Sequence, residues 1–230
     1  MKLHNSVALV TGANRGLGLA FTKALVAAGA KVYAAARDPA SIGQAGVEAV
    51  KLDVTNEAEV EVLAKKLGDV TLIVNNAGIA RGSGFLSPGG IEAQRAELET
   101  NFFGPLLLAR AFAPTLAKNG GGAIVNVLSA LSWLSSPAFA TYCASKSAAW
   151  SLSNGLRHEL KAQGTQVLSL HVGYMDTDMV RHVTAPKANP DDVVRDTLAA
   201  LEAGKSEILA DDTSRMVKKG LTAEPGLYLG

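Results

Sequence analysis

The chain is poor in cysteine, in histidine and in net charge, and each shortage removes a class of function. Cys143 is the single cysteine, so no internal disulfide can form. The four histidines show no paired spacing with one another or with Cys143, and we therefore expect no metal site. The net charge is +1, with lysines and arginines scattered along the chain. No basic face results, so we expect no binding to nucleic acid.

Long apolar runs are also missing. The most apolar long segment, 102–113, is interrupted by Gly104, Pro105 and Arg110 and is too short to span a bilayer. Residues 1–10 lead into a glycine-rich turn without the apolar stretch of a signal peptide, so we expect a cytoplasmic protein with no membrane partner. The 230 residues, 48% of them hydrophobic, suffice for one sizeable core, and we predict a single domain over 1–230.

Predicted strands and helices alternate along the chain. Short apolar runs closed by turn residues predict strands at 7–10, 32–36, 47–52, 70–74, 123–128, 165–172 and 207–209. Helical spacing predicts helices at 17–28, 57–67, 91–116, 139–160 and 190–203, and Pro105 should kink or divide the third of these. This alternation predicts an α/β fold, with a doubly wound parallel seven-stranded sheet, helices on both faces and ligands at the carboxyl ends of the strands.

A glycine-rich turn, Thr-Gly-Ala-Asn-Arg-Gly-Leu-Gly at 11–18, joins the first predicted strand to the first helix. Glycine permits a tight turn and a close approach of the backbone to a ligand. The helix N-terminus offers unpaired N–H groups to a pyrophosphate. Glycine turns also occur without a ligand, but the position directly after a buried N-terminal strand favours a dinucleotide site.

The end of the second predicted strand indicates which dinucleotide fits. An acidic residue there would bind the free ribose 2′-hydroxyl of NAD, but this chain has Ala36 followed by Arg37. Arg15 in the glycine-rich turn adds a second cation. Arg37 could instead pair with the neighbouring Asp38, yet two arginines at these places favour the 2′-phosphate of NADP(H).

Tyr142 and Lys146 lie four residues apart on a predicted helix, so their side chains share one face. An ammonium beside a phenol favours the phenolate, which would lower the pKa of Tyr142 and suit it to acid/base chemistry near neutral pH. A solvated tyrosine beside a solvated lysine would give the same spacing. The motifs elsewhere in the chain decide between the two interpretations.

Four motifs occur in order: the glycine-rich turn, Asn75-Asn-Ala-Gly78, Ser129 and Tyr142-x3-Lys146. In this order, and over nearly the whole chain, they resemble the short-chain dehydrogenase/reductase family in its short single-domain form. The resemblance implies a Rossmann fold and an NADP(H)-preferring carbonyl reductase, or ketoreductase. The catalytic residues that it implies are Asn101, Ser129, Tyr142 and Lys146. The cofactor-binding residues are Gly12, Asn14, Arg15, Gly16, Leu17, Gly18, Arg37, Asp53, Val54, Asn75, Ala77, Gly78, Tyr142, Lys146, Gly173 and Thr177.

The resemblance also implies a role for each catalytic residue. Tyr142 would give a proton to the carbonyl oxygen of the substrate, which the Ser129 hydroxyl would hold. Lys146 would lower the pKa of the tyrosine and bind the nicotinamide ribose, and Asn101 would hold a water that relays protons to the lysine. Asp53 and Val54 would contact the adenine.

The chain departs from the family pattern at two positions. Relatives usually have Pro-Gly after the sixth strand, where this chain has Val172-Gly173, and they often have a serine in place of Leu128. Thr177 is the expected partner of the nicotinamide carboxamide. The segment 174–189 would form a short lid over an open cleft. Candidates for the substrate pocket, for some of which core packing is an equal alternative, are Ala130, Leu131, Trp133, Phe139, Tyr174, Met175 and Met179.

The leading hypothesis is an NADPH-dependent oxidoreductase that reduces a ketone or aldehyde, reversible as an alcohol dehydrogenase. The alternatives are a catalytically silent NADP(H)-binding regulator and an isomerase or dehydratase on the same scaffold. Small and apolar residues on the helices 102–116 and 139–160, among them Ala144, Ala148, Trp150 and Leu152, predict a homodimer or homotetramer.

Overall fold

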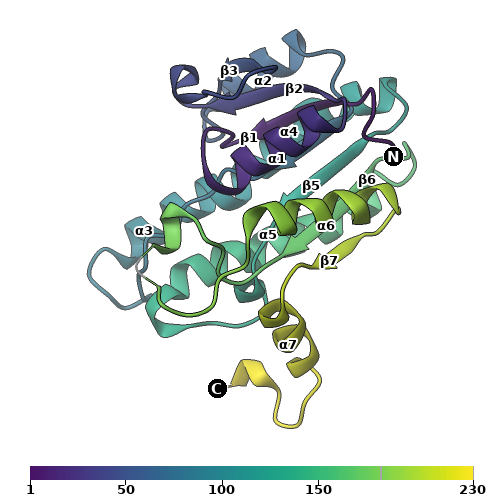
Figure 1. Cartoon of the computed structure of the whole chain (residues 1–230). Coiled ribbons are helices and arrows are strands. Elements are labelled where there is room, and N and C mark those ends of the chain that lie inside the picture. The colour runs from purple at the N-terminus through teal and green to yellow at the C-terminus, as the bar shows by residue number, and fades with distance from the viewer. Residues whose placement is uncertain (182, 230) are drawn as a thin grey trace.

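The computed structural model describes residues 1–181 and 183–229 and contains one parallel seven-stranded sheet (Figure 1). The strand order is β3-β2-β1-β4-β5-β6-β7, so the chain winds outward in both directions from β1. The strands are β1 (Val7–Thr11), β2 (Lys31–Ala36), β3 (Glu48–Lys51), β4 (Leu72–Asn75), β5 (Ala123–Val127), β6 (Gln166–His171) and β7 (Glu207–Leu209). The predicted fold class and the seven strands are confirmed.

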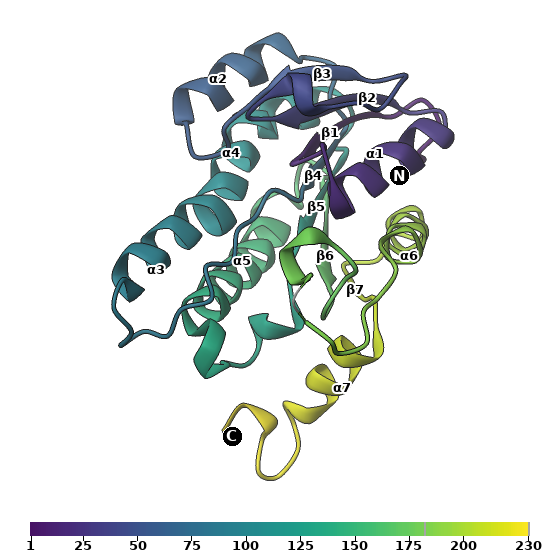
Figure 2. The ribbon, with the colours of Figure 1, turned by 60° about the vertical axis from the view of Figure 1, so that its left-hand side comes forward.

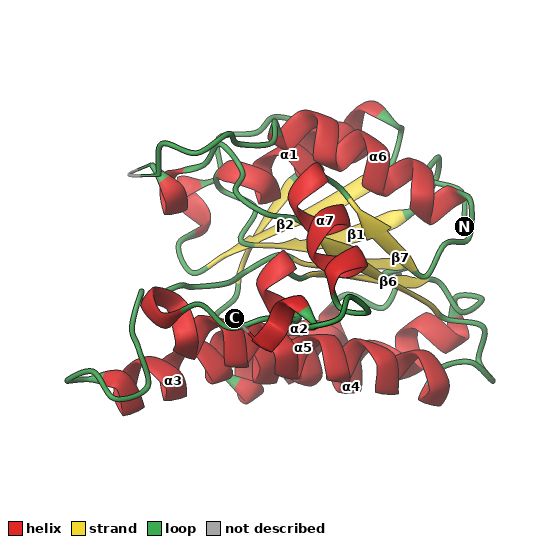
Figure 3. Cartoon of the chain, turned by 90° about the horizontal axis from the view of Figure 1, so that it is seen from below, coloured by secondary structure: helices red, strands yellow, loops and turns green. Residues whose placement is uncertain are grey.

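Two helix layers cover the sheet, with α1 and α6 on one face and α2, α4 and α5 on the other (Figure 3). Of the other two helices, α3 packs against α5, whereas α7 covers neither face, and Figure 2 shows α7 below β6 and β7, beyond the end of the sheet. The helices are α1 (Gly16–Ala27), α2 (Glu57–Lys66), α3 (Gly90–Leu98), α4 (Gly104–Lys118), α5 (Ala140–Glu159), α6 (Pro190–Glu202) and α7 (Asp212–Gly220). No helix among the described residues is both long and apolar enough to cross a membrane.

Burial on both faces explains why the strands are continuous apolar runs. In β1, Ala8 and Val10 pack into the cluster under α1 and α6, whereas Leu9 between them packs into the cluster under α4 and α5. All three side chains are fully buried. Side chains in a strand alternate between faces, so a sheet covered on both sides needs an apolar residue at every position. The carboxyl ends of these strands meet at one edge, where the predicted site residues lie.

The long predicted helix at 91–116 is divided, and a π-helical turn over Glu99–Phe103 separates α3 from α4. Pro105 stands in the first turn of α4, directly after the π-helical turn, and it has no N–H to donate back to that turn. The π-helical turn carries Asn101, which is 2% exposed. Turns of this kind inside helices occur often at functional sites.

Candidate active site

The glycine-rich turn after β1 is shaped for close backbone approach. Gly12 and Gly16 have positive φ values of 63° and 52°, which favour glycine. A Cβ on Gly18 would lie 2.1 Å from the carbonyl oxygen of Gly12, so this helix position accepts no side chain. The first residue of α1 follows Arg15, whose side chain does not cap the helix. The N–H groups of the first turn therefore remain open, which fits the pyrophosphate of a dinucleotide.

The end of β4 is linked to this turn by Asn76. Its side-chain amide donates to the carbonyl oxygens of Thr11 and Gly12, across 2.8 and 3.2 Å, and its backbone N–H donates to the Thr11 hydroxyl across 3.0 Å. Asn75, which the sequence analysis assigned to the cofactor, is 4% exposed and donates to Asn126 inside the protein. Successive strand residues face opposite ways, so the neighbouring asparagine lines the cleft instead.

The cleft beyond the end of β2 carries positive charge. Arg37 is exposed and lines this cleft, while the neighbouring Asp38 accepts the N–H of Ala40. No Arg37–Asp38 ion pair occurs among the residues that the structure describes. The backbone N–H of Thr55, and then its hydroxyl and nearby Arg37, hold the pKa of Asp53 below its usual value against the effect of burial. The carboxylate of Asp53 is thus ionised and partly engaged within its own turn.

A cavity of about 860 Å³ connects these groups with Tyr142 and Lys146, two of the four predicted catalytic residues. The predicted cofactor-binding residues that line it are Gly12, Asn14, Arg15, Gly16, Leu17, Arg37, Asp53, Val54, Ala77, Gly78, Tyr142, Lys146 and Thr177. Thr11 and Asn76 also line the cavity and were not predicted, although they lie inside the glycine-rich turn and the Asn75–Gly78 motif. The glycine cradle, the uncapped helix and Arg37 together fit a phosphorylated dinucleotide.

Tyr142 lies in the first turn of α5 and is half-buried. Burial raises the pKa of its hydroxyl above the ordinary value, and the neighbouring Ser129 hydroxyl opposes this only in part. The spacing of Tyr142 and Lys146 predicts a lowered pKa for the tyrosine, because it places the lysine ammonium beside the phenol. That prediction is wrong for this structure, and Tyr142 remains protonated at neutral pH, ready to donate.

Lys146 is 6% exposed and lies one helical turn after Tyr142. Its Nζ donates to the carbonyl oxygen of Val127 across 2.8 Å and lies 5.7 Å from the centre of the Tyr142 ring. Burial disfavours the ammonium and lowers the pKa of Lys146 to about 8. The lysine therefore titrates close to physiological pH.

Asn101 in the π-helical turn fixes the chain that follows β4. Its side-chain amide donates to the carbonyl oxygen of Ile79 and to the hydroxyl of Ser145, both across 2.9 Å. Its Oδ1 accepts the N–H of Ile79, also across 2.9 Å. A Cβ on Gly78 would lie 3.1 Å from this oxygen. The side chain thus holds the wall of the cleft in place, while the predicted water relay stays a prediction.

Ser129 begins a short helical turn, Ala130–Ser132, at the end of β5. Its Oγ accepts the N–H of Leu131 across 3.1 Å, and its own N–H donates to the hydroxyl of Ser132 across 3.2 Å. These contacts fix the backbone on both sides of the hydroxyl, which remains free to donate its proton. Tyr142 and Lys146 line one end of the cavity, and the buried Ser129 hydroxyl lies beside Tyr142 without lining the cavity itself.

The predicted substrate pocket is only partly assembled at this end. Trp133 is 8% exposed and packs with Ala130 and Val217 in a separate cluster against α7, so it is a core residue. Met175 lines the cleft. Leu131 and Phe139 are half-buried outside the cleft lining, Tyr174 is 36% exposed, and the side chain of Met179 lies outside the described residues.

The loop after β6 approaches the glycine-rich turn from across the cleft. A Cβ on Gly16 would lie 3.3 Å from the methyl group of Thr177, so this threonine faces the pyrophosphate end. Gly173, predicted to bind the cofactor, instead donates its N–H to Asp211 across 2.7 Å and does not line the cavity in the described chain. Arg15 and Asp178 approach to 3.5 Å across the mouth of the cleft.

Comparison with known proteins gives consistent matches. The family model described as short chain dehydrogenase matches residues 6–188. A crystal structure of a short chain dehydrogenase from Burkholderia cenocepacia in complex with NADP is 41% identical, with a TM-score of 0.94, and the match covers 98% of this chain and 96% of that one. The 1-deoxy-11-beta-hydroxypentalenate dehydrogenase of Streptomyces exfoliatus is 31% identical, with 97% of this chain and 82% of that protein covered. An uncharacterized oxidoreductase of Staphylococcus saprophyticus is 30% identical, and the match covers 88% of this chain and 93% of that protein.

Proposed function

The chain belongs to the short-chain dehydrogenase/reductase family of oxidoreductases, and on this basis we propose that it is an NADPH-dependent carbonyl reductase of the EC 1.1.1 type. The substrate class is a ketone or aldehyde, and the reverse reaction is an alcohol oxidation. The observation that carries the proposal is the position of Tyr142, which lies beside Ser129 in the same cavity as the glycine-rich turn and Arg37.

The protonation state of Tyr142 suits reduction. A carbonyl oxygen gains negative charge as its carbon accepts hydride, and it needs a donor that is already in place. Burial keeps the hydroxyl of Tyr142 protonated because it raises the pKa, so the residue acts as the proton donor. The hydroxyl of Ser129 donates a hydrogen bond to the same oxygen. Bound NADPH would supply the hydride.

Lys146 supports the tyrosine electrostatically. Its Nζ lies 5.7 Å from the ring centre of Tyr142, close enough for a positive charge to favour the tyrosinate that remains after proton transfer. Asn101 keeps Gly78 and Ile79 at the wall of the cleft through three hydrogen bonds. Lys146 thus acts through its charge, and Asn101 acts through its hydrogen bonds to the wall of the cleft.

The preference for NADPH rests on the residues at the end of β2. Ala36 leaves no carboxylate at the position that would bind a free ribose hydroxyl, and Arg37 offers a guanidinium to a 2′-phosphate. Arg15 lines the same cavity. The NADP complex of the related Burkholderia cenocepacia protein supports the same choice.

Replacement of Tyr142 by phenylalanine tests the proposal. We expect Tyr142→Phe to abolish NADPH consumption with a panel of ketones and aldehydes, while the Kd for NADPH stays within about twofold, since the ring is retained. Tyr228→Phe, at a 56% exposed position, is the matched control and should keep full activity. Full turnover in Tyr142→Phe would overturn the mechanism. NADPH binding without consumption across the panel would favour a regulator, and product formation without net NADPH consumption would favour an isomerase or dehydratase.

We also propose that the protein forms a homodimer or homotetramer through α4 and α5. Phe103, the last residue of the π-helical turn before α4, is 40% exposed, and Leu107, Ala111 and Leu152 on the two helices are only partly buried. An apolar surface of this kind favours association between copies. A molar mass from light scattering that equals the mass of one chain would contradict this proposal.

A further inference from the structure

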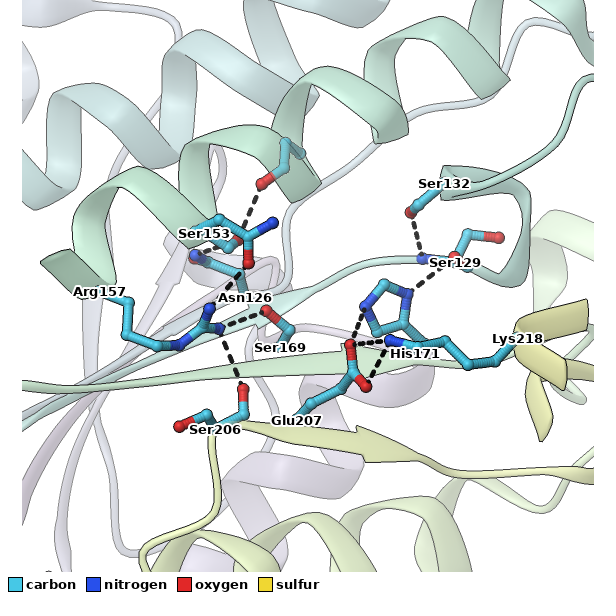
Figure 4. Close-up of polar contacts among 12 residues, drawn as sticks. Asn126, Ser129, Ser132, Ser153, Arg157, Ser169, His171, Ser206, Glu207 and Lys218 are labelled. Carbon is cyan, nitrogen blue, oxygen red and sulfur yellow. Dashed lines mark hydrogen bonds and ion pairs between the residues drawn. The ribbon is translucent and has the colours of Figure 1, made fainter. Parts of the chain in front are cut away.

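His171 lies directly behind Ser129. It is the last residue of β6, it is fully buried, and its Nδ1 is 3.1 Å from the carbonyl oxygen of Ser129 (Figure 4). A carbonyl oxygen can only accept, so Nδ1 must carry the proton and donate. The same oxygen also accepts the N–H of Ser132 across 3.0 Å. The turn that presents the serine hydroxyl is thus fixed from β6 as well as from within.

The other ring nitrogen of His171 faces a charge pair from the C-terminal part of the chain. Its Nε2 is 3.6 Å from Oε1 of Glu207 in β7, and it has no hydrogen-bond partner among the described residues. Lys218 of α7 donates to both carboxylate oxygens of Glu207, across 2.8 and 2.7 Å. The ammonium neutralises the carboxylate, which can therefore lie beside an uncharged imidazole.

Trp133 holds the imidazole ring in its plane. The two rings are stacked, with centres 3.8 Å apart and an angle of 17° between the planes. Lys218 of α7, which pairs with Glu207, also contacts this tryptophan, and its Nζ lies 4.7 Å from the Trp133 ring centre. Rotation of His171 away from Ser129 would break the stack, so the orientation of its Nδ1–H is determined by packing as well as by hydrogen bonding.

We propose that His171 is a positioning residue for Ser129, held in place by Trp133 and by the Glu207–Lys218 pair of β7 and α7. The inference rests on the proposed function, because it assigns the Ser129 hydroxyl to the substrate carbonyl. His171 touches neither substrate nor cofactor. It acts by holding the Ser129 peptide, and with it the hydroxyl, at the position where charge develops during reduction.

Two substitutions separate positioning from general stability. Asparagine can present an amide N–H at the same distance from Cβ as Nδ1, so His171→Asn keeps the donor but leaves a cavity. His171→Leu fills the space better but removes the donor. We expect His171→Leu to lower kcat for carbonyl reduction about tenfold or more, with the Kd for NADPH within about twofold. We expect His171→Asn to keep kcat within about threefold of the wild type despite a lower Tm.

If the proposal holds, His171→Asn has the higher kcat and His171→Leu has the higher Tm. A kcat that follows Tm in both variants, or wild-type turnover in His171→Leu, would overturn the inference alone. A wild type that consumes no NADPH with any carbonyl would overturn the proposed function and this inference with it. Long-range proton–nitrogen NMR gives a second test, with the His171 signal assigned by its loss in His171→Asn. A proton on Nδ1 at neutral pH is expected, and a proton on Nε2 alone would contradict the contact with Ser129.

Discussion

The carboxylate of Asp211 accepts the backbone N–H of Gly173 across 2.7 Å and so joins α7 to the loop that leaves β6. The other oxygen of Asp211 accepts the N–H of Ser214 across 2.7 Å and caps α7. A Cβ on Gly173 would lie 2.9 Å from the same carboxylate, so the contact leaves no room for a side chain. This hydrogen bond constrains the loop directly after Val172, where the family resemblance led us to expect a proline.

Asp211→Ala should therefore affect both stability and cofactor binding. The loss of a helix cap and of a hydrogen bond to a charged group should lower the free energy of unfolding by about 2 kcal/mol. The loop that carries Met175 and Thr177 loses its anchor, so the KM for NADPH should rise more than kcat falls. Urea denaturation and steady-state kinetics measure the two effects. Asp212→Ala is the control, since the neighbouring carboxylate is fully exposed, and it should change neither quantity appreciably.

Arg37→Ala should weaken NADPH binding selectively. A charge-assisted hydrogen bond to a phosphate contributes about 1.5–3 kcal/mol, so we expect the Kd for NADPH to rise about tenfold or more and the Kd for NADH to stay unchanged. Fluorescence titration of both cofactors measures the ratio. Arg195→Ala, an exposed arginine on α6, controls for the loss of one positive charge. An equal loss for both cofactors would contradict the role of Arg37 at the 2′-phosphate.

Carbonyl reduction should slow as the pH rises through the pKa of Lys146. Burial lowers this pKa to about 8, so the residue is an ammonium below that pH and a neutral amine above it. If the positive charge favours the tyrosinate of Tyr142, kcat/KM for NADPH at saturating carbonyl should be constant at lower pH and should fall above about pH 8, because this parameter reports the free enzyme. Lys146→Arg keeps the charge and should remove that fall in any variant that retains turnover. A kcat/KM that increases as the pH rises through this range would contradict a favourable effect of the positive charge on Lys146.

Two glycine substitutions on helices should have opposite effects. At Gly18 in α1 a Cβ would lie 2.1 Å from the carbonyl oxygen of Gly12, so Gly18→Ala must displace the turn that approaches the cofactor. At Gly155 in α5 nothing lies within 4 Å of such a Cβ. Gly155→Ala should raise the free energy of unfolding by about 1 kcal/mol through helix propensity alone. Gly18→Ala should lower Tm and weaken NADPH binding, and thermal unfolding with and without NADPH measures both variants.

Local pattern was sufficient to predict most of the fold. The strand at 7–10 is apolar at every position because both faces are covered, and the helix at 17–28 repeats apolar residues at helical spacing. Pro105 predicted the division of the long helix. The break itself is the π-helical turn Glu99–Phe103, which ends directly before α4 begins at Gly104. In contrast, α7 has only Met216 and Val217 as apolar residues, so its helix was not predicted. Val217 is 5% exposed because it packs against Trp133, a contact that no local pattern contains.

The site was predictable in its residue types but not in its side-chain contacts. Asn75 and Asn76 stand next to each other, and only the phase of β4 decides which one lines the cleft. The spacing of Tyr142 and Lys146 was sufficient to predict a shared helix face, but the pKa of the tyrosine depends on its burial. Trp133 was assigned to the substrate pocket because α7, which covers it, was not predicted. A contact with Val217 of α7, late in the chain, thus decided that Trp133 is a core residue.

The position of β7 and α7 has a consequence for biosynthesis. Ser129 leaves the ribosome well before His171, Glu207 and Lys218, and β7 can pair with the edge of the sheet only after β6 has been made. A nascent chain that ends before Glu207 already contains β1, α1 and the glycine-rich turn. If His171 positions the serine as proposed, such a chain gains a nucleotide-binding half first, and catalytic competence begins with the emergence of α7.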